Sequence, residues 1–145
     1  MHAMTHADPN NEATFHVCVI RSDLEQTEIP KQLILDDLER HRFDESAIFA
    51  MKLAMEEALT NAVKHGNCFD PCKPVTVRYA VSDEMVAVIV RDEGGGFVPT
   101  EVPDPTSPDR LPLPNGRGIM LLRAYMDNVE YRDQGREVYF AKRRG

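Results

Sequence analysis

Two strand-forming runs joined by a short polar link constrain the fold of this 145-residue chain more than any other feature. In the first run, 75–81, apolar residues alternate with polar or small ones, which is typical of a strand with one wet face. The second run, 85–90, is almost entirely apolar, so we expect it to lie in the centre of a sheet. The link Ser82-Asp83 favours a hairpin, and the two runs therefore predict an antiparallel pair.

Helices and further strands surround this hairpin in the sequence. Asp44 is a candidate N-cap for the longer of two helices before the hairpin, and Gly66 occupies the usual glycine position after its C-terminus. The expected elements are a strand at 15–20, helices at 28–41 and from Asp44 to about His65, the hairpin strands, a helix at 117–126, and strands at 128–133 and 137–142 turned at Gln134-Gly135. Antiparallel strands beside clustered helices predict an α+β sandwich.

Length and charge limit the classes of protein that the chain can belong to. A chain of 145 residues suits one compact domain with its own core. A net charge of −7 argues against a general nucleic-acid binder or a protein that binds anionic membranes. No apolar run approaches the roughly 20 residues of a membrane-spanning helix. Residues 1–13 lack the apolar centre of a signal peptide, so we expect a disordered tail there and a cytoplasmic protein.

The cysteines give a weaker signal. An odd number, Cys18, Cys68 and Cys72, without a dense pattern fits a reducing compartment. His65, Cys68 and Cys72 lie close together in the sequence, and a metal site can be imagined there. Their spacing matches no established zinc pattern and a fourth ligand is missing, so this interpretation is the weaker one.

The predicted helix at 44–65 has a polar face although most of its residues are apolar. Its apolar stripe is formed at helical spacing by Ile48, Met51, Met55, Ala58, Leu59 and Ala62. Glu57, Asn61 and Lys64 fall on the opposite side, with His65 next to them. An amide oxygen can bind Mg²⁺, and a carboxylate can orient or deprotonate a nucleophile. Taken alone, the same residues equally describe a solvated outer face.

Two glycine-containing segments follow the hairpin. In "RDEGGGF" (91–97), Asp92 ends the most apolar strand, where a buried carboxylate needs partners such as the exocyclic amine of adenine. Gly94 and Gly96 allow a ligand to approach the backbone closely. In "NGRGIMLL" (115–122), Gly116, Arg117 and Gly118 open a helix, where free N–H groups suit phosphate. A glycine-rich turn and a flexible hinge explain each segment equally well on its own.

The ordered set of these motifs resembles the Bergerat-fold (GHKL) ATPase superfamily, and within it the small bacterial anti-sigma-factor serine kinases. "EALTNAVKHG" is similar to the family's N-box, "DEGGGF" to its first glycine box, and "NGRGIMLLRAYMD" to its second. The resemblance extends from about Phe15 to Lys142. It implies a two-layer sandwich at 14–145 with a mixed, mostly antiparallel sheet, helices on one face, and a short ATP lid at about 94–116.

The resemblance also implies roles for the motif residues. Glu57 would be the catalytic base or orienter, Asn61 would bind Mg²⁺, and Asp92 would bind the adenine amine. The remaining residues around the nucleotide would be Lys64, His65, Gly94, Gly96, Gly116, Arg117 and Gly118. One departure is Gly135-Arg136-Glu137, where the family often has a threonine that supports the adenine site.

The implied activity is an ATP- and Mg²⁺-dependent serine/threonine protein kinase. Its substrate would be a small anti-anti-sigma (STAS-type) protein, its second partner a sigma factor, and homodimerisation is usual among relatives. One alternative is a non-catalytic nucleotide-binding switch that sequesters a protein partner. Another is the catalytic fragment of a sensor histidine kinase, although this sequence shows no phosphoacceptor helical hairpin.

Overall fold

The computed structural model describes residues 7–95 and 122–145, which form one five-stranded sheet with helices against it. The strand order is β1-β2-β3-β5-β4. The strands are β1 (His16–Ile20), β2 (Val75–Val81), β3 (Met85–Arg91), β4 (Asn128–Arg132) and β5 (Glu137–Arg143). The α+β class predicted from the sequence is confirmed. Every strand pairing in the described part is antiparallel, however, where a mixed sheet was expected, because β5 turns back from β4 and pairs with β3.

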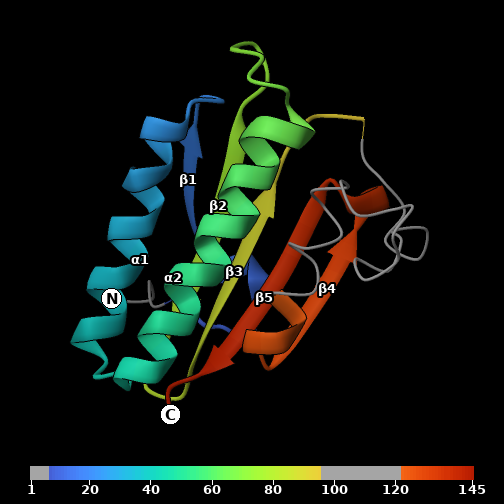
Figure 1. Cartoon of the computed structure of the whole chain (residues 1–145). Coiled ribbons are helices and arrows are strands. Elements are labelled where there is room, and N and C mark those ends of the chain that lie inside the picture. Colours follow the sequence, from blue (N-terminus) through green and yellow to red (C-terminus); the bar gives the residue numbers. More distant parts are fainter. Residues whose placement is uncertain (1–6, 96–121) are drawn as a thin grey trace, which may run out of the picture.

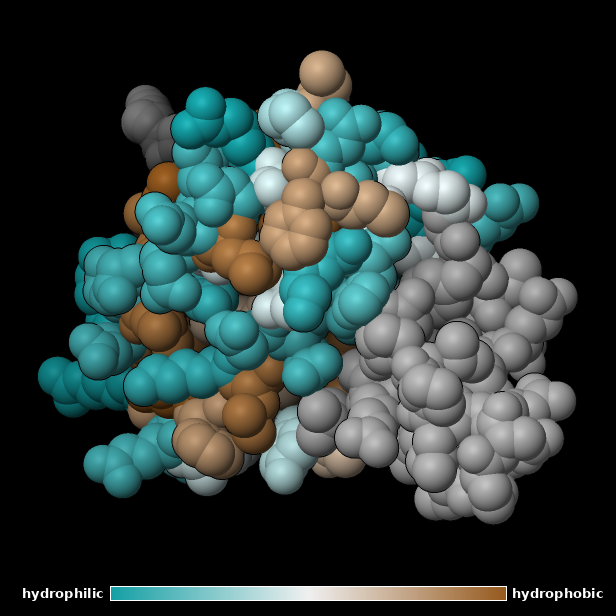
Figure 2. Space-filling model, turned by 45° about the horizontal axis from the view of Figure 1, so that its top comes forward, coloured by the Kyte–Doolittle hydropathy of each residue, from teal (hydrophilic) through white to brown (hydrophobic). Residues whose placement is uncertain are grey.

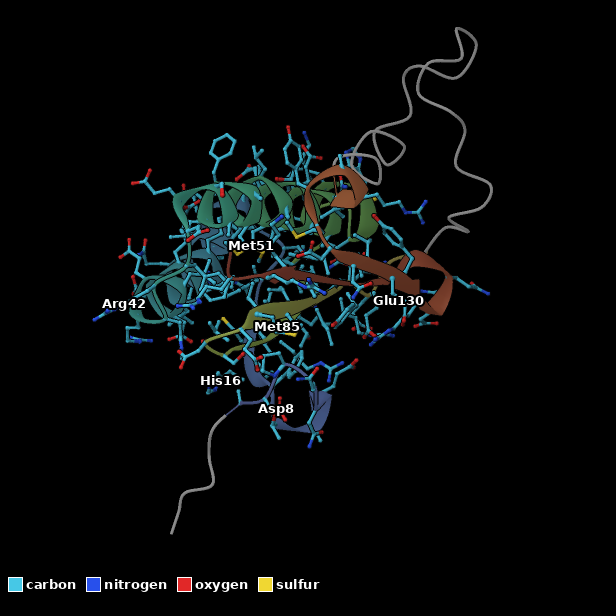
Figure 3. All side chains as sticks on the ribbon, turned by 90° about the horizontal axis from the view of Figure 1, so that it is seen from below. Asp8, His16, Arg42, Met51, Met85 and Glu130 are labelled. Carbon is cyan, nitrogen blue, oxygen red and sulfur yellow. The ribbon has the colours of Figure 1, made fainter. Side chains whose placement is uncertain are left out.

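The helices α1 (Glu28–Arg40) and α2 (Glu45–Thr60) both cover the same face of the sheet (Figure 1). In the view of Figure 3, Met51 lies between α2 and the sheet, whereas Asp8 lies on the opposite side. The core between the layers is fully apolar at its centre, with the largest buried side chains being Phe140, Ile34, Leu38, Met51, Met55 and Leu59. The apolar stripe that the sequence predicted for α2 therefore packs against the sheet and contributes to the core between the two layers.

The helix α2 changes its hydrogen-bonding pattern near its end. Asp44 is its N-cap in extended conformation, as predicted, but its side chain makes no capping hydrogen bond to the helix. At Asn61 the helix continues as a π-helical turn, η3 (Asn61–Gly66). Because π turns widen the helix and are frequent at functional sites, η3 marks the end of α2 as a place of interest.

The far face of the sheet carries a smaller apolar cluster, and the chain before β1 covers part of it. Phe15 is buried there, in a cluster with Ala80, Ala87, Ile89 and Ala141. The carboxylate of Glu12 accepts two hydrogen bonds of 2.8 Å from the Arg132 guanidinium. For residues 7–13 the expected disordered tail is therefore replaced by a packed segment, since Phe15 and Glu12 anchor it to the sheet.

Several large hydrophobic side chains are exposed in the described part of the chain. The described part of the face in Figure 2 is a mosaic of small hydrophobic patches among hydrophilic side chains. On the edge strand β1, Val17 and Val19 are 62% and 60% exposed, and they point to the same side as predicted. In the described ranges, no helix is long and apolar enough to cross a membrane.

Candidate functional site

The end of β3 holds a buried carboxylate where it leaves the sheet. Asp92 is only 8% exposed. Its Oδ1 accepts a hydrogen bond of 2.9 Å from the backbone N–H of Gly94. Burial raises the pKa of Asp92, while the Gly94 N–H and the positive charges of Arg136 and Arg91 oppose this shift. We expected from the sequence that this carboxylate would need partners. Those in the described residues are the backbone N–H of Gly94 and the charges of Arg136 and Arg91.

Two glycines allow η3 to lie directly on this carboxylate. A Cβ atom added to Gly66 would overlap the carboxylate of Asp92, and one added to Gly94 would overlap the carbonyl of Gly66. The sequence predicted Gly66 as a helix-ending glycine, but it is the last residue of η3 and the chain stays in the right-handed region at Asn67. The glycine at position 66 is therefore required by close packing against Asp92.

Asn67 connects three parts of the site and was not predicted from the sequence. It is 1% exposed, and its Oδ1 accepts a 2.8 Å hydrogen bond from the N–H of Glu93. Its Nδ2 donates to Ser22 Oγ and to the carbonyls of Lys73 and Pro74 at 2.9–3.0 Å. One amide side chain thus fixes the end of η3, the start of β2 and the residue after Asp92. Its partners are up to 45 residues away in sequence, so periodicity gave no signal for it.

We expect Asn67→Ala to lower the free energy of unfolding by about 3 kcal/mol, because buried donors and acceptors lose their partners. Urea denaturation followed by circular dichroism measures this. Asn128→Ala is the matched control, because Asn128 is exposed at the start of β4, and it should change stability by less than about 0.5 kcal/mol. Equal effects of the two substitutions would show that Asn67 has no special role.

Glu57 and Asn61 lie where α2 passes into η3, and both are half-buried. The N–H of Asn61 donates to the carbonyl of Glu57, so their side chains lie on neighbouring turns. Glu57 also faces β4. Burial is the main cause that raises the pKa of Tyr131, the charge of Arg123 opposes it, and the charge of Glu57 adds to it. Glu57 is therefore on a partly enclosed side of the helix. The alternative that Glu57 belongs to a fully solvated outer face does not fit this position.

Lys64 and His65 are exposed on η3. Partial burial of the ring is the largest cause that lowers the pKa of His65; the charge of Lys64 lowers it further and that of Glu57 raises it. At neutral pH this favours the uncharged imidazole. Lys64 lies beside His65 on η3 and is exposed.

Arg136, in the turn between β4 and β5, reaches the glycine segment from the other side. Its Nε–H donates to the carbonyl of Gly94 at 2.8 Å, and Nη2 donates to that of Gly95 at 3.1 Å. Its backbone carbonyl accepts a 2.8 Å hydrogen bond from the N–H of Asp92. The sequence identified this position only as a departure from the family pattern, and the structure shows that it contacts Asp92 and the two glycines that follow.

Part of the predicted site falls outside the described residues. Gly96, Gly116, Arg117, Gly118 and nearly all of the predicted lid at 94–116 lie there, as does most of the predicted helix at 117–126, of which 122–125 are helical. Among the described residues, Glu57 and Asn61 are linked where α2 passes into η3, and Gly66 at the other end of η3 packs against Asp92. The described residues contain no group of three or more His, Cys, Asp and Glu side chains suited to a metal ion.

The chemistry of the described site fits an adenine nucleotide. Oδ1 of Asp92 is occupied by the Gly94 N–H, and within 7–95 and 122–145 no group donates a hydrogen bond to Oδ2. A buried carboxylate oxygen without a donor is costly, and an exocyclic amine would satisfy it. Mg²⁺ bound to nucleotide needs only one or two protein oxygens in addition to phosphates and water. The amide oxygen of Asn61, next to Glu57, meets that need.

Comparison with known proteins agrees with this chemistry. The family model of the histidine kinase-like ATPase domain matches residues 20–142. The serine-protein kinase RsbW of Listeria monocytogenes serotype 4a is 32% identical over 113 residues, covering 71% of this chain and 70% of the relative. The Bacillus licheniformis protein of the same name is 34% identical over 103 residues, covering 63% and 62%. The anti-sigma F factor of Oceanobacillus iheyensis is 29% identical over 97 residues, covering 63% and 66%.

Proposed function

This chain belongs to the histidine kinase-like ATPase domain family, and on that premise we propose that it is an ATP-dependent serine/threonine protein kinase. We assign the ATPase domain to residues 14–145 and the ATP lid to about 94–116. The kinase would act as an anti-sigma-type regulator that phosphorylates a small anti-anti-sigma protein. Relatives named serine-protein kinase and anti-sigma F factor support this role.

The buried carboxylate of Asp92 carries the nucleotide part of the proposal. Its Oδ2, which accepts no hydrogen bond from the described residues, would accept the exocyclic amine of adenine, and the absence of side chains at Gly66 and Gly94 would let the base approach the backbone. A carboxylate in this position would repel the O6 carbonyl oxygen that guanine has in place of the amine. The pocket thus favours ATP over GTP.

The phosphoryl-transfer part of the proposal depends on Glu57. Its carboxylate would orient the partner's serine hydroxyl and accept its proton, as positioning and charge neutralisation dominate phosphoryl transfer. The amide oxygen of Asn61 would hold Mg²⁺, and bound Mg²⁺ would neutralise phosphate charge. Lys64 and His65 are exposed on η3, where the β- and γ-phosphates of a nucleotide held by Asp92 and Asn61 would extend. Gly96, Gly116, Arg117 and Gly118 are proposed to complete the phosphate site.

The protein partners are proposed from the family. The substrate would be a STAS-type anti-anti-sigma protein in a partner-switching pathway, and a sigma factor would be the sequestered partner. A homodimer is part of the proposal, with the exposed Val17 and Val19 on edge strand β1 as candidate contacts.

We expect radiolabelled phosphate to pass from ATP to a serine of the cognate anti-anti-sigma protein when the purified chain and Mg²⁺ are present. The label is followed on gels and located by mass spectrometry. Acid treatment is the control, because phosphoserine survives it and phosphohistidine does not. An acid-labile label on this chain itself would instead indicate a histidine kinase fragment. A partner that binds but acquires no label would contradict the kinase assignment.

A non-catalytic switch is the second candidate, and Arg136 is the observation that favours it. An arginine that fastens the glycine segment suggests a pocket built to hold nucleotide firmly. Titration calorimetry separates the two functions. A switch would bind ATP and change its affinity for the partner without phosphorylating it.

A further inference from the structure

The turn between β4 and β5 has a conformation that aims one side chain at the glycine segment. Asp133, Gln134 and Gly135 all have positive φ, between 51° and 85°. This left-handed turn is unusual for residues other than glycine. It brings Arg136 alongside the end of β3, where the N–H of Asp92 donates to the Arg136 carbonyl at 2.8 Å. The turn and the strand end are thus joined beyond the last paired residues of β3 and β5.

The guanidinium of Arg136 then holds the segment that follows Asp92. Nε donates to Gly94 and Nη2 to Gly95, at 2.8 and 3.1 Å, while Nη1 lies 3.4 Å from Asp133. Glycine has more conformational freedom than other residues, so hydrogen bonds from outside the segment help to order its backbone. A planar guanidinium can donate to two carbonyls at once, which an ammonium group does less well.

The charge of Arg136 also acts on the base-binding carboxylate. Among the described residues, the charged groups that act on Asp92 are Arg136 from the β4–β5 turn and Arg91 and Glu93, which flank Asp92 in sequence. From η3, Gly66 packs against the carboxylate. Arg91 is engaged with Asp133 at 2.7 Å. The negative charge of Glu93 acts in the opposite direction to the arginines and raises the pKa of Asp92. Arg136 and Arg91 both oppose the effect of burial on the pKa of Asp92, and Arg136 is the one that also donates to the backbone after Asp92.

We propose that Arg136 is the positioning residue of the nucleotide pocket, holding the Gly94-Gly95 backbone in place beside the carboxylate of Asp92 that binds the base amine. The proposal rests on the nucleotide-binding function above. No contact between Arg136 and the nucleotide is required by it.

The test is ATP affinity against pH, by calorimetry, for the wild type, Arg136→Gln and Arg136→Lys. We expect Arg136→Gln to weaken ATP binding roughly 10- to 100-fold at pH 7.5, because it removes charge-assisted hydrogen bonds. It should also move the pH at which affinity falls on acidification upward, since Asp92 loses one of the cations that lower its pKa. Arg136→Lys should restore the pH profile and only part of the affinity.

Arg132→Gln is the matched control. Arg132 lies in the same hairpin and pairs with Glu12 and Glu130, but on the far side of the sheet. If loss of hairpin stability explained the effect, Arg132→Gln would weaken ATP binding as much as Arg136→Gln. His65 also titrates, but its contribution is common to all variants. Wild-type binding with an unchanged pH profile in Arg136→Gln would overturn this inference alone, whereas a wild type that fails to bind ATP would overturn the proposed function.

Discussion

Glu57→Gln is expected to slow phosphoryl transfer to the partner serine by about 10²–10⁴-fold while changing ATP affinity by less than about threefold. The reason is chemical, since glutamine fills the same volume beside Asn61 but cannot accept the serine proton. Single-turnover transfer of radiolabel, with saturating ATP and partner, measures the rate. Calorimetry on the same preparation measures the affinity.

The neighbouring carboxylate provides the control for that experiment. Glu56 is one residue earlier on α2, but it points to α1, where it pairs with Lys31 at 2.5 Å. Glu56→Gln removes the same charge from the same helix and should leave transfer within about twofold, because exposed ion pairs contribute little. Wild-type transfer rates in Glu57→Gln would remove Glu57 from the reaction and leave the switch as the better function.

Asp92→Asn is expected to weaken ATP binding by about 100-fold or more, a loss of about 3 kcal/mol. The substituted asparagine can keep the bond from Gly94 through its Oδ1, but it then presents an amide donor to the base amine. Purine riboside triphosphate lacks this amine and gives the decisive comparison by calorimetry. The wild type should bind it much more weakly than ATP, whereas Asp92→Asn should bind both equally.

Glu93→Gln controls for loss of negative charge beside the pocket, because Glu93 is partly exposed and has only a 3.8 Å ion pair with Arg91. It should leave ATP affinity within about twofold. The pH dependence has a definite sign. Burial raises the pKa of Asp92, so ATP binding should be complete above that pKa and should decline on acidification earlier than for an exposed aspartate. Equal discrimination of the two nucleotides by Asp92→Asn and wild type would contradict the assignment of Asp92.

The elements of the fold that have a periodic sequence pattern were predictable. The alternating run at 75–81 and the apolar run at 85–90 became β2 and β3 with nearly the expected limits. The stripe that includes Met51, Met55 and Leu59 is buried as expected. In each case the signal is local periodicity, which depends only on residues a few positions apart.

The parts of the site that depend on contacts between distant segments were not predictable in the same way. Gly66 was interpreted from its place after a helix, but its reason is the Asp92 carboxylate 26 residues later. Asn67 gave no pattern at all. Arg136 was noted only as part of a departure from the family pattern. Conversely, Asp92 was identified correctly as a buried strand-end carboxylate needing partners, because one strong apolar strand is sufficient evidence for burial.

The position of β5 between β3 and β4 has a consequence for protein synthesis. Strands β1, β2 and β3 can pair as soon as they leave the ribosome, but β4 has only β5 as its neighbour in the described sheet. β5 emerges after all of them, and Arg136 is the residue that immediately precedes it. A nascent chain that ends before the β4–β5 turn therefore has Asp92 without Arg136, and one that ends before β5 also leaves β3 without its second neighbour in the described sheet. The described sheet is therefore completed only after β5 has been translated, because β5 is the strand that joins β4 to β3.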